Sequence, residues 1–294
     1  MSGHHLPLRH GLLALAVVAV WGTNFVVIKV ALAALPPLLL AVLRFTFALL
    51  PAVLFLPRPA VPLRKLAAYG SLIGAGQFGL LYLAINGHIA PGLASLVIQI
   101  QVFFTIGLAM LADGEKLRPV QGVALALATA GIVLIAAYTG GESSDTSIGG
   151  LALVLLAAAS WACGNQVSRS MGRVQMLPMV VWSSAFALPP LLVLSLVFEG
   201  PARWQAGFAA ATWPVWAAVL WQAVGNTLFG YASWGWLLSR HPAATVAPMA
   251  LLVPVFGMAA SAWYLGEGLP AWKLGAAALV LSGLALNLFG VRRR

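Results

Sequence analysis

The chain has 294 residues, of which 62% are hydrophobic and only 7% are charged, and its formal net charge is +10. A soluble domain carries about a quarter charged residues, so this composition excludes an ordinary soluble protein and indicates an integral membrane protein. The apolar runs reach the roughly 20 residues that a spanning helix needs, and they lack the alternation of a β-barrel. The single cysteine, Cys163, excludes an intramolecular disulfide and a thiolate metal site. The basic residues flank the apolar runs, where they set orientation, so we expect no nucleic-acid partner.

The sequence predicts ten membrane-spanning helices and no soluble domain. The first follows a short polar lead, residues 1–10. Because it is long enough to span and leads into further spans, we expect it to stay uncleaved, with a signal peptide as the alternative. The polar stretches 139–147 and 199–212 are predicted linkers. The ten spans cover about 12–31, 36–57, 67–87, 92–112, 119–138, 148–168, 177–198, 213–236, 243–265 and 272–290.

Lys and Arg are distributed unevenly between the two ends of these spans. With the N-terminus inside, the outer side receives Lys29, Arg203 and Lys273. The cytoplasmic side receives Arg9, Arg58, Arg64, Lys65, Lys116, Arg118, Arg169, Arg173, Arg240, Arg292, Arg293 and Arg294. By the positive-inside rule, both termini of this multi-pass membrane protein are predicted to be cytoplasmic.

Four pairs of sequence anchors, in the same order, indicate that residues 141–294 repeat residues 1–140. The pairs are Trp21-Gly22-Thr23-Asn24 with Trp161-Ala162-Cys163-Gly164-Asn165, Gly76-Gln77 with Gly225-Asn226, Gly114-Glu115 with Gly266-Glu267, and Gly131 with Gly283. Each half has five predicted spans, an odd number, so the second half must cross the membrane in the opposite sense. Such inverted repeats are the architecture of secondary transporters, which bind substrate near the bilayer midplane.

Four short motifs carry a family resemblance, and they are Trp21-Gly22-Thr23-Asn24, Leu43-Arg44-Phe45, Pro254-Val255-Phe256 and Gly266-Glu267. With these motifs the chain resembles, over nearly its whole length, the EamA-type carriers of the drug/metabolite transporter superfamily. Members of that family export amino acids and other metabolites from bacteria, and the chain is most similar to exporters of aromatic amino acids. One departure is Gln101, where the family's fourth helix has proline. It puts the bending of that helix in doubt and adds a polar side chain.

Uncharged amides are the main polar side chains inside the predicted spans. Polar groups there are costly and usually face a cavity or another helix. In the eighth span Gln222, Asn226, Phe229 and Ser233 follow helical spacing and are expected to share one face. Gln77 of the third span is expected to oppose Asn226 across the repeat axis. A single amide is equally well explained by a hydrogen bond between helices and by a position in a cavity wall. For the matched pair of Gln77 and Asn226 we favour the cavity wall.

Aromatic residues near the middle of spans are expected to wall the cavity, whereas those at span ends fit the interfacial belt. The predicted substrate-binding residues are Trp21, Asn24, Gln77, Tyr82, Gln101, Trp161, Asn165, Gln222, Asn226 and Tyr231. Arg44 lies about 10 Å into the second span if that span is helical. We interpret it as a snorkelling or capping side chain, with an anchor for a substrate carboxylate as the less favoured alternative.

Acidic residues are missing from the predicted spans, which contain no Asp or Glu, and His88 lies near a span end, where a solvated loop histidine is expected. A proton-coupled carrier needs a titratable group in its pathway. The sequence therefore predicts uncoupled facilitated transport or exchange, through a cavity without a fixed net charge. Such a cavity suits a zwitterion or a neutral molecule.

These features together predict an exporter of amino acids and related small metabolites, aromatic amino acids preferred, that works by alternating access, with no catalytic residue, metal or cofactor. An exporter of cationic or hydrophobic toxic compounds is the alternative, and it is disfavoured because no carboxylate lies within the spans. A membrane enzyme would need clustered His, Asp, Glu or Cys, whereas the histidines are scattered. The expected partners are the small-molecule substrate and the lipid bilayer, and the sequence is compatible with a monomer.

Overall fold

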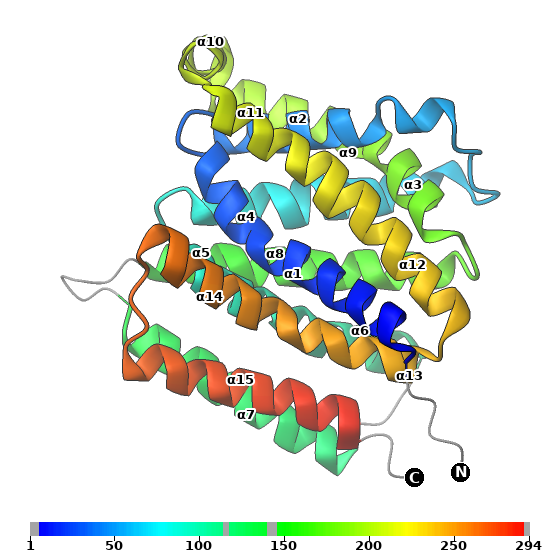
Figure 1. The fold of residues 1–294 in the computed structure, drawn as a ribbon, viewed down its shortest axis with the longest axis vertical. Coiled ribbons are helices and arrows are strands. Elements are labelled where there is room, and N and C mark those ends of the chain that lie inside the picture. Colours follow the sequence, from blue (N-terminus) through cyan, green and yellow to red (C-terminus); the bar gives the residue numbers. More distant parts are fainter. Residues whose placement is uncertain (1–5, 114–117, 140–145, 291–294) are drawn as a thin grey trace.

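The computed structural model describes residues 6–113, 118–139 and 146–290, and within these ranges the regular elements are all helices (Figure 1). Nine helices in the described ranges are long and apolar enough to cross a membrane. They are α1 (Leu8–Ala31), α2 with η1 (Pro37–Leu54), α3–η2–α4 (Leu63–Ile85), α5–η3–α6 (Pro91–Ala112), α7 (Pro119–Ala137), α8 (Ile148–Ser170), α9 (Met176–Phe198), η5–α14 (Ala247–Leu265) and α15 (Ala271–Gly290). The prediction of an all-helical membrane protein is confirmed for this part of the chain.

The eighth predicted span is a continuous helical stretch of α11 (Trp213–Leu220), η4 (Trp221–Phe229) and α12 (Gly230–Arg240). It is not among the nine candidate spans, because its tryptophans, glycines and amides lower its mean hydropathy. The count of ten spans therefore stays a prediction. Among the predicted anchors, Gly114-Glu115 lies outside the described residues, as do Lys116, most of the predicted linker 139–147 and the C-terminal arginines.

Irregular helical segments interrupt the third and fourth spans of each half. A π-helical segment, η2 (Leu72–Gly79), joins α3 (Leu63–Ser71) to α4 (Leu80–Ile85), and η4 is the π-helical segment between α11 and α12. The 3₁₀ segments are η3 (Ile98–Ile100), between α5 (Pro91–Val97) and α6 (Gln101–Asp113), and η5 (Ala247–Leu252), between α13 (Ala243–Val246) and α14 (Val253–Leu265). The fourth span is thus irregular although Gln101 stands where the family has proline.

The helices of the two halves pack in matching pairs (Figure 1). α1 packs against α14, η4 and α12, and correspondingly α8 packs against α6, η2 and α4. α2 (Pro37–Leu49) packs against α9, and α7 pairs with α15 at one edge of the bundle. Each contact is reproduced when the halves are exchanged, as a repeated architecture requires. The opposite membrane orientation of the two halves stays a prediction.

One predicted linker is wrong, because residues 199–212 contain the helix α10 (Gly200–Ala210). Pro201 occupies the first turn, where its missing N–H costs nothing, and the alanines that follow favour helix. In Figure 1 this helix is seen end-on and lies across the end of the bundle.

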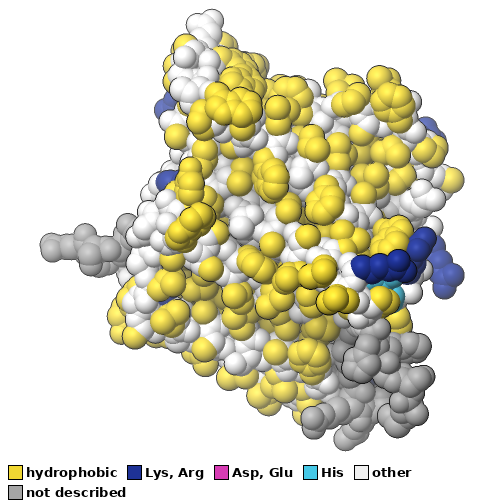
Figure 2. Space-filling view, viewed as in Figure 1, with side chains coloured by type: hydrophobic (Ala, Val, Ile, Leu, Met, Phe, Trp, Pro, Cys, Tyr) yellow, Lys and Arg dark blue, Asp and Glu magenta, His cyan; other side chains and the backbone are white. Residues whose placement is uncertain are grey.

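Apolar side chains are spread over the whole face shown in Figure 2, and the Lys and Arg side chains gather mainly at one edge. Val133 of α7 and Val193 and Val197 of α9 are more than half exposed. Such an outer surface would be a liability in water, but it suits helices in contact with lipid.

Candidate functional site

Arg44 of α2 is the centre of a buried polar cluster. Its side chain is only 1% exposed. Nη1 donates to the Tyr82 hydroxyl of α4 at 2.9 Å, and Nη2 donates to Oδ1 of Asn226 at 2.8 Å and to Oγ1 of Thr227 at 3.1 Å. The guanidinium carbon lies 3.7 Å from the centroid of the Phe78 ring, in cation–π geometry. One arginine thus connects helices of both halves of the chain.

The π-helical segment η4 places two consecutive polar residues, Asn226 and Thr227, against this arginine. The Thr227 hydroxyl donates at 2.9 Å to the carbonyl of Gln222, five residues earlier, in step with the wider π turn. The Gln222 amide nitrogen donates to the carbonyl of Ala218 at 3.3 Å, and its oxygen accepts from the Tyr82 hydroxyl. Gln222 is fully buried, so its polar atoms are satisfied within the protein.

Trp21 of α1 adds an aromatic wall beside the same segment. Its indole N–H donates to the backbone carbonyl of Asn226 at 3.1 Å. Its ring lies 5.7 Å from that of Tyr231 and 5.1 Å from that of Trp234, centroid to centroid. A Cβ at Gly230 would lie 2.4 Å from the indole nitrogen, so the close approach of α1 to α12 requires glycine there.

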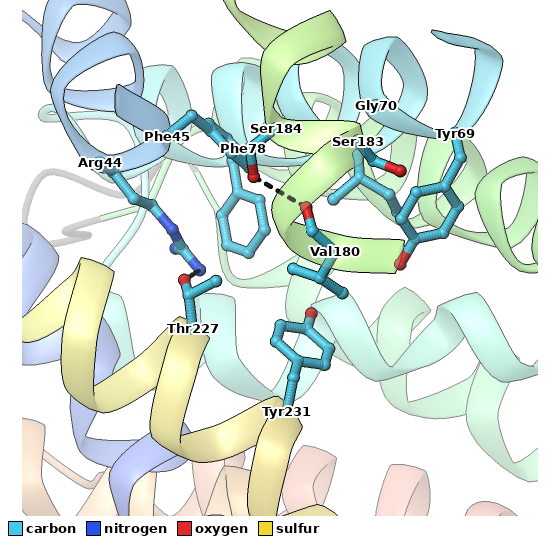
Figure 3. A pocket seen from close by; sticks show the side chains of 11 residues that line it. Arg44, Phe45, Tyr69, Gly70, Phe78, Val180, Ser183, Ser184, Thr227 and Tyr231 are labelled. Carbon is cyan, nitrogen blue, oxygen red and sulfur yellow. Dashed lines mark hydrogen bonds between the residues drawn. The ribbon is translucent and has the colours of Figure 1, made fainter. Parts of the chain in front are cut away.

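A small cavity lies beside Arg44, between α2, α3, α9 and the η4–α12 stretch (Figure 3). Its volume is about 10 Å³, room for at most one water molecule. It is lined by Arg44, Phe45, Tyr69, Gly70, Ile73, Phe78, Val180, Ser183, Ser184, Thr227 and Tyr231. The expectation of a cavity without a fixed charge is therefore wrong, because the guanidinium of Arg44 forms part of its wall.

The sequence pattern of the EamA-like transporter family matches residues 9–137 and 148–289. The chain belongs to this family. It is therefore a multi-pass membrane transporter rather than an enzyme, and the buried cluster around Arg44 is its candidate substrate site.

Two relatives resemble the transporter along nearly its whole length. It is 43% identical over 291 residues to the "Probable amino-acid metabolite efflux pump" of Salmonella typhimurium strain LT2, and 42% identical to the protein of the same name in Escherichia coli K12. Each match covers 97% of both chains. It is also 25% identical to the uncharacterized transporter YoaV of Bacillus subtilis, over 95% of this chain and 97% of that one. A solved crystal structure shares its fold, with a TM-score of 0.63, 21% identity and 97% of each chain covered.

A second polar cluster joins α6 and α8 of the transporter. The Asn165 side-chain nitrogen donates to Oε1 of Gln101 at 2.9 Å and to the Thr105 hydroxyl at 3.4 Å. The Thr105 hydroxyl donates in turn to the Gln101 backbone carbonyl at 2.8 Å. Gln101 and Asn165 are half-buried, and they do not line the cavity beside Arg44. This cluster fits the alternative that such amides form hydrogen bonds that hold helices together.

The ten predicted site residues thus fall into separate groups. Trp21, Tyr82, Gln222, Asn226 and Tyr231 surround Arg44, and Gln101 and Asn165 form the second cluster. The remaining three make no hydrogen bond with either cluster among the described residues; Asn24 and Gln77 are buried and Trp161 packs at the core. In particular, Oε1 of Gln77 has no described partner, so the predicted opposition of Gln77 and Asn226 is not seen as a contact.

The predicted face of the eighth span is also wrong in part. It was derived from α-helical spacing, whereas a π turn brings residues five apart onto one side. Phe229 is accordingly 39% exposed, while Thr227 is only 1% exposed and contacts Arg44. Thr227 was missed for this reason. Arg44 was assigned mainly to snorkelling, although a guanidinium in mid-span was the signal that could have identified it.

Two buried glutamates tie the helices together at one end of the bundle. Glu199, after α9, accepts from the backbone N–H groups of Leu38 at 2.6 Å and Leu39 at 2.9 Å, in the first turn of α2. Glu267, after α14, accepts from the backbone N–H of Gly92 at 3.0 Å, in the first turn of α5, and forms an ion pair with Lys273 at 3.1 Å. Carboxylates are favoured at helix N-termini because the helix dipole is positive there. We call these contacts the Glu199 latch and the Glu267 latch, and each joins the second half of the chain to the first.

Proposed function

We propose that this transporter exports amino acids and related small metabolites across the bacterial inner membrane, with a preference for aromatic amino acids and with both termini in the cytoplasm. Its full-length similarity to two probable amino-acid metabolite efflux pumps supports the substrate class. The motifs that resemble the aromatic amino acid exporter YddG support the aromatic preference.

The main observation in support of the proposal is the lining of the cavity beside Arg44. A cation, hydroxyl groups and aromatic rings meet there, contributed by Arg44, Ser183, Tyr69, Phe78 and Tyr231. A zwitterion with an aromatic side chain presents the complementary groups, a carboxylate, an ammonium and a ring. The lining thus fits an aromatic amino acid better than a purely apolar compound.

Alternating access between two inverted five-helix repeats, residues 1–140 and 141–294, is the proposed mechanism. The matching helix pairs, the matching π and 3₁₀ segments and the two segments of the family match support it. The Glu199 and Glu267 latches hold one end of the bundle together. The cavity wall includes Tyr69, in the last turn of α3, and Val180, near the start of α9. Both helices start at the opposite end of the bundle, which the charge distribution predicts to be cytoplasmic. This conformation then corresponds to a transporter closed toward the outside.

Uncoupled transport is supported by the cavity lining, which contains a guanidinium but no carboxylate or histidine among the described residues. The same guanidinium argues against the alternative of an exporter for cationic toxins, since a fixed positive charge repels a cation in a medium of low dielectric constant.

The test is uptake of labelled phenylalanine, tryptophan and threonine by the purified protein in liposomes, with and without an imposed pH gradient, against protein-free liposomes. We expect saturable uptake that is fastest for the aromatic amino acids and is unchanged by the gradient. Uptake that requires the gradient would overturn the uncoupled mechanism. Absence of uptake of all three amino acids would overturn the substrate class.

A further inference from the structure

Arg44 carries a buried positive charge that nothing in the described protein neutralises. Its described hydrogen-bond partners, the side chains of Tyr82, Asn226 and Thr227, are all neutral. Among the residues that the structure describes, the carboxylates of the Glu199 and Glu267 latches bind other groups, and neither makes a hydrogen bond or ion pair with Arg44. A charge held in a membrane protein usually has a counter-charge or lines a pathway for charged solutes. The position of Arg44 in the cavity wall indicates the second case.

Two polar groups of this cavity lack a partner. Nε of Arg44 is buried and makes no hydrogen bond with the described residues, and the same holds for the Ser183 hydroxyl of α9. Their side chains are 1% and 2% exposed, so bulk water does not satisfy them. Buried polar groups are nearly always hydrogen-bonded, and an unsatisfied pair at one cavity therefore points to a ligand that supplies both partners.

A structural role in connecting helices does not explain why the buried residue at position 44 is a charged arginine. Neutral donors would connect α2, α4 and η4 without the cost of burying a charge. The face of the Phe78 ring, 3.7 Å from the guanidinium carbon, offsets only part of that cost. The remaining field is positive and directed into a space walled by Phe45, Tyr69 and Tyr231, so it favours an anionic group on a molecule with an apolar body.

We infer that Arg44 binds the carboxylate of the transported molecule, with the aromatic walls around its apolar part and the Ser183 hydroxyl at its polar remainder. This inference rests on the proposed function and assigns its binding residue. A cavity of about 10 Å³ does not hold an amino acid, so binding requires the helices that line it to separate. The carboxylate then accepts from the free N–H of the guanidinium, forming a charge-assisted hydrogen bond.

The experiment compares two competitors in counterflow of labelled phenylalanine into liposomes. L-Phenylalaninol has the ring and amine of phenylalanine but a hydroxymethyl group in place of the carboxylate. In the wild type it should compete about 10- to 100-fold more weakly than unlabelled phenylalanine, the range expected for a hydrogen bond to a charged group. In Arg44→Gln this ratio should fall to about one. Arg64→Gln, at an exposed arginine at the start of α3, is the matched control and should keep the wild-type ratio.

Arg44→Lys keeps the positive charge, and it tests the inference even if Arg44→Gln does not fold. It should preserve discrimination, with weaker binding of phenylalanine, because an ammonium lacks the planar array of donors. A wild-type ratio in Arg44→Gln, or equal competition by both compounds in the wild type, would overturn the inference and leave amino acid export standing. If Arg44→Gln does not fold, loss of discrimination in Arg44→Lys would also overturn it.

Failure of the proposed function is distinguished by a binding measurement on the purified protein. If the wild type transports no amino acid, its thermal stabilisation by 3-phenylpropanoate is compared with that of Arg44→Gln. Stabilisation that depends on Arg44 would support the carboxylate site without amino acid export. Equal behaviour of the two proteins would overturn the site.

Discussion

In the buried ion pair of Glu267 and Lys273, the carboxylate has more additional hydrogen bonds than the ammonium. The carboxylate also accepts from the Gly92 N–H at 3.0 Å and from the Ser261 hydroxyl at 2.6 Å. Apart from Glu267, the described partner of the ammonium is the ring of Trp272, whose centroid lies 5.7 Å away. The ammonium therefore depends on the carboxylate more than the carboxylate depends on the ammonium.

This asymmetry predicts which substitutions of the pair destabilise the protein most. Removing one member of a buried pair costs about 3–5 kcal/mol when the other charge is left without a partner. Glu267→Gln leaves Lys273 in that state and should cost this full amount. Lys273→Met leaves a carboxylate with two hydrogen bonds, each worth about 1.5–3 kcal/mol to a charged group, so it should cost about 1–2 kcal/mol. The double variant removes both charges and should be about as stable as Lys273→Met alone.

The assay is the free energy of unfolding of the three variants in one detergent, followed by tryptophan fluorescence. Arg203→Met, at an exposed arginine of α10, is the control and should change stability by less than about 0.5 kcal/mol. If Lys273→Met is as destabilising as Glu267→Gln, or if the double variant is no more stable than Glu267→Gln, the assigned asymmetry is wrong.

Three further predictions follow from close contacts. Asn226→Leu removes an acceptor from the buried guanidinium and should lower transport about 10-fold or more, whereas Gln77→Leu, at an amide that neither bonds to Arg44 nor lines its cavity, should retain transport. Equal losses of the two variants in liposome counterflow would contradict the assignment of the site. A Cβ at Gly70 would lie 2.1 Å from a backbone oxygen of α9, so Gly70→Ala should reduce counterflow by displacing the cavity wall, and normal transport would show that α3 and α9 separate without cost. A Cβ at Gly283 would lie 2.6 Å from a backbone oxygen of α7, so Gly283→Leu should lower the melting temperature by separating α15 from α7, and an unchanged melting temperature would refute this packing.

The membrane character, the helical class and the approximate positions of the helices could be predicted from the sequence. These properties are local, because a segment in lipid must satisfy its own backbone hydrogen bonds and so forms a helix wherever about 20 apolar residues follow one another. Mid-span polar residues such as Tyr82, Gln222 and Asn226 were identified for the same reason, since each is too costly to face lipid. The helix α10 was missed because a short helix at the end of a bundle carries no spanning signal.

Which polar side chains contact one another depends on the tertiary structure. The spacing of η4 in sequence is compatible with an ordinary α-helix, and the wider π turn that turns Thr227 toward Arg44 depends on how α1, α2 and η4 pack. Likewise, the sequence places Arg44 at a depth in the membrane but does not tell whether its side chain reaches the lipid headgroups or the bundle interior. That choice depends on partners contributed by α4 and η4, about 40 and 180 positions away. Depth in the membrane and apolarity follow from the sequence of a single helix, whereas the hydrogen bonds of a buried charge require side chains from several helices.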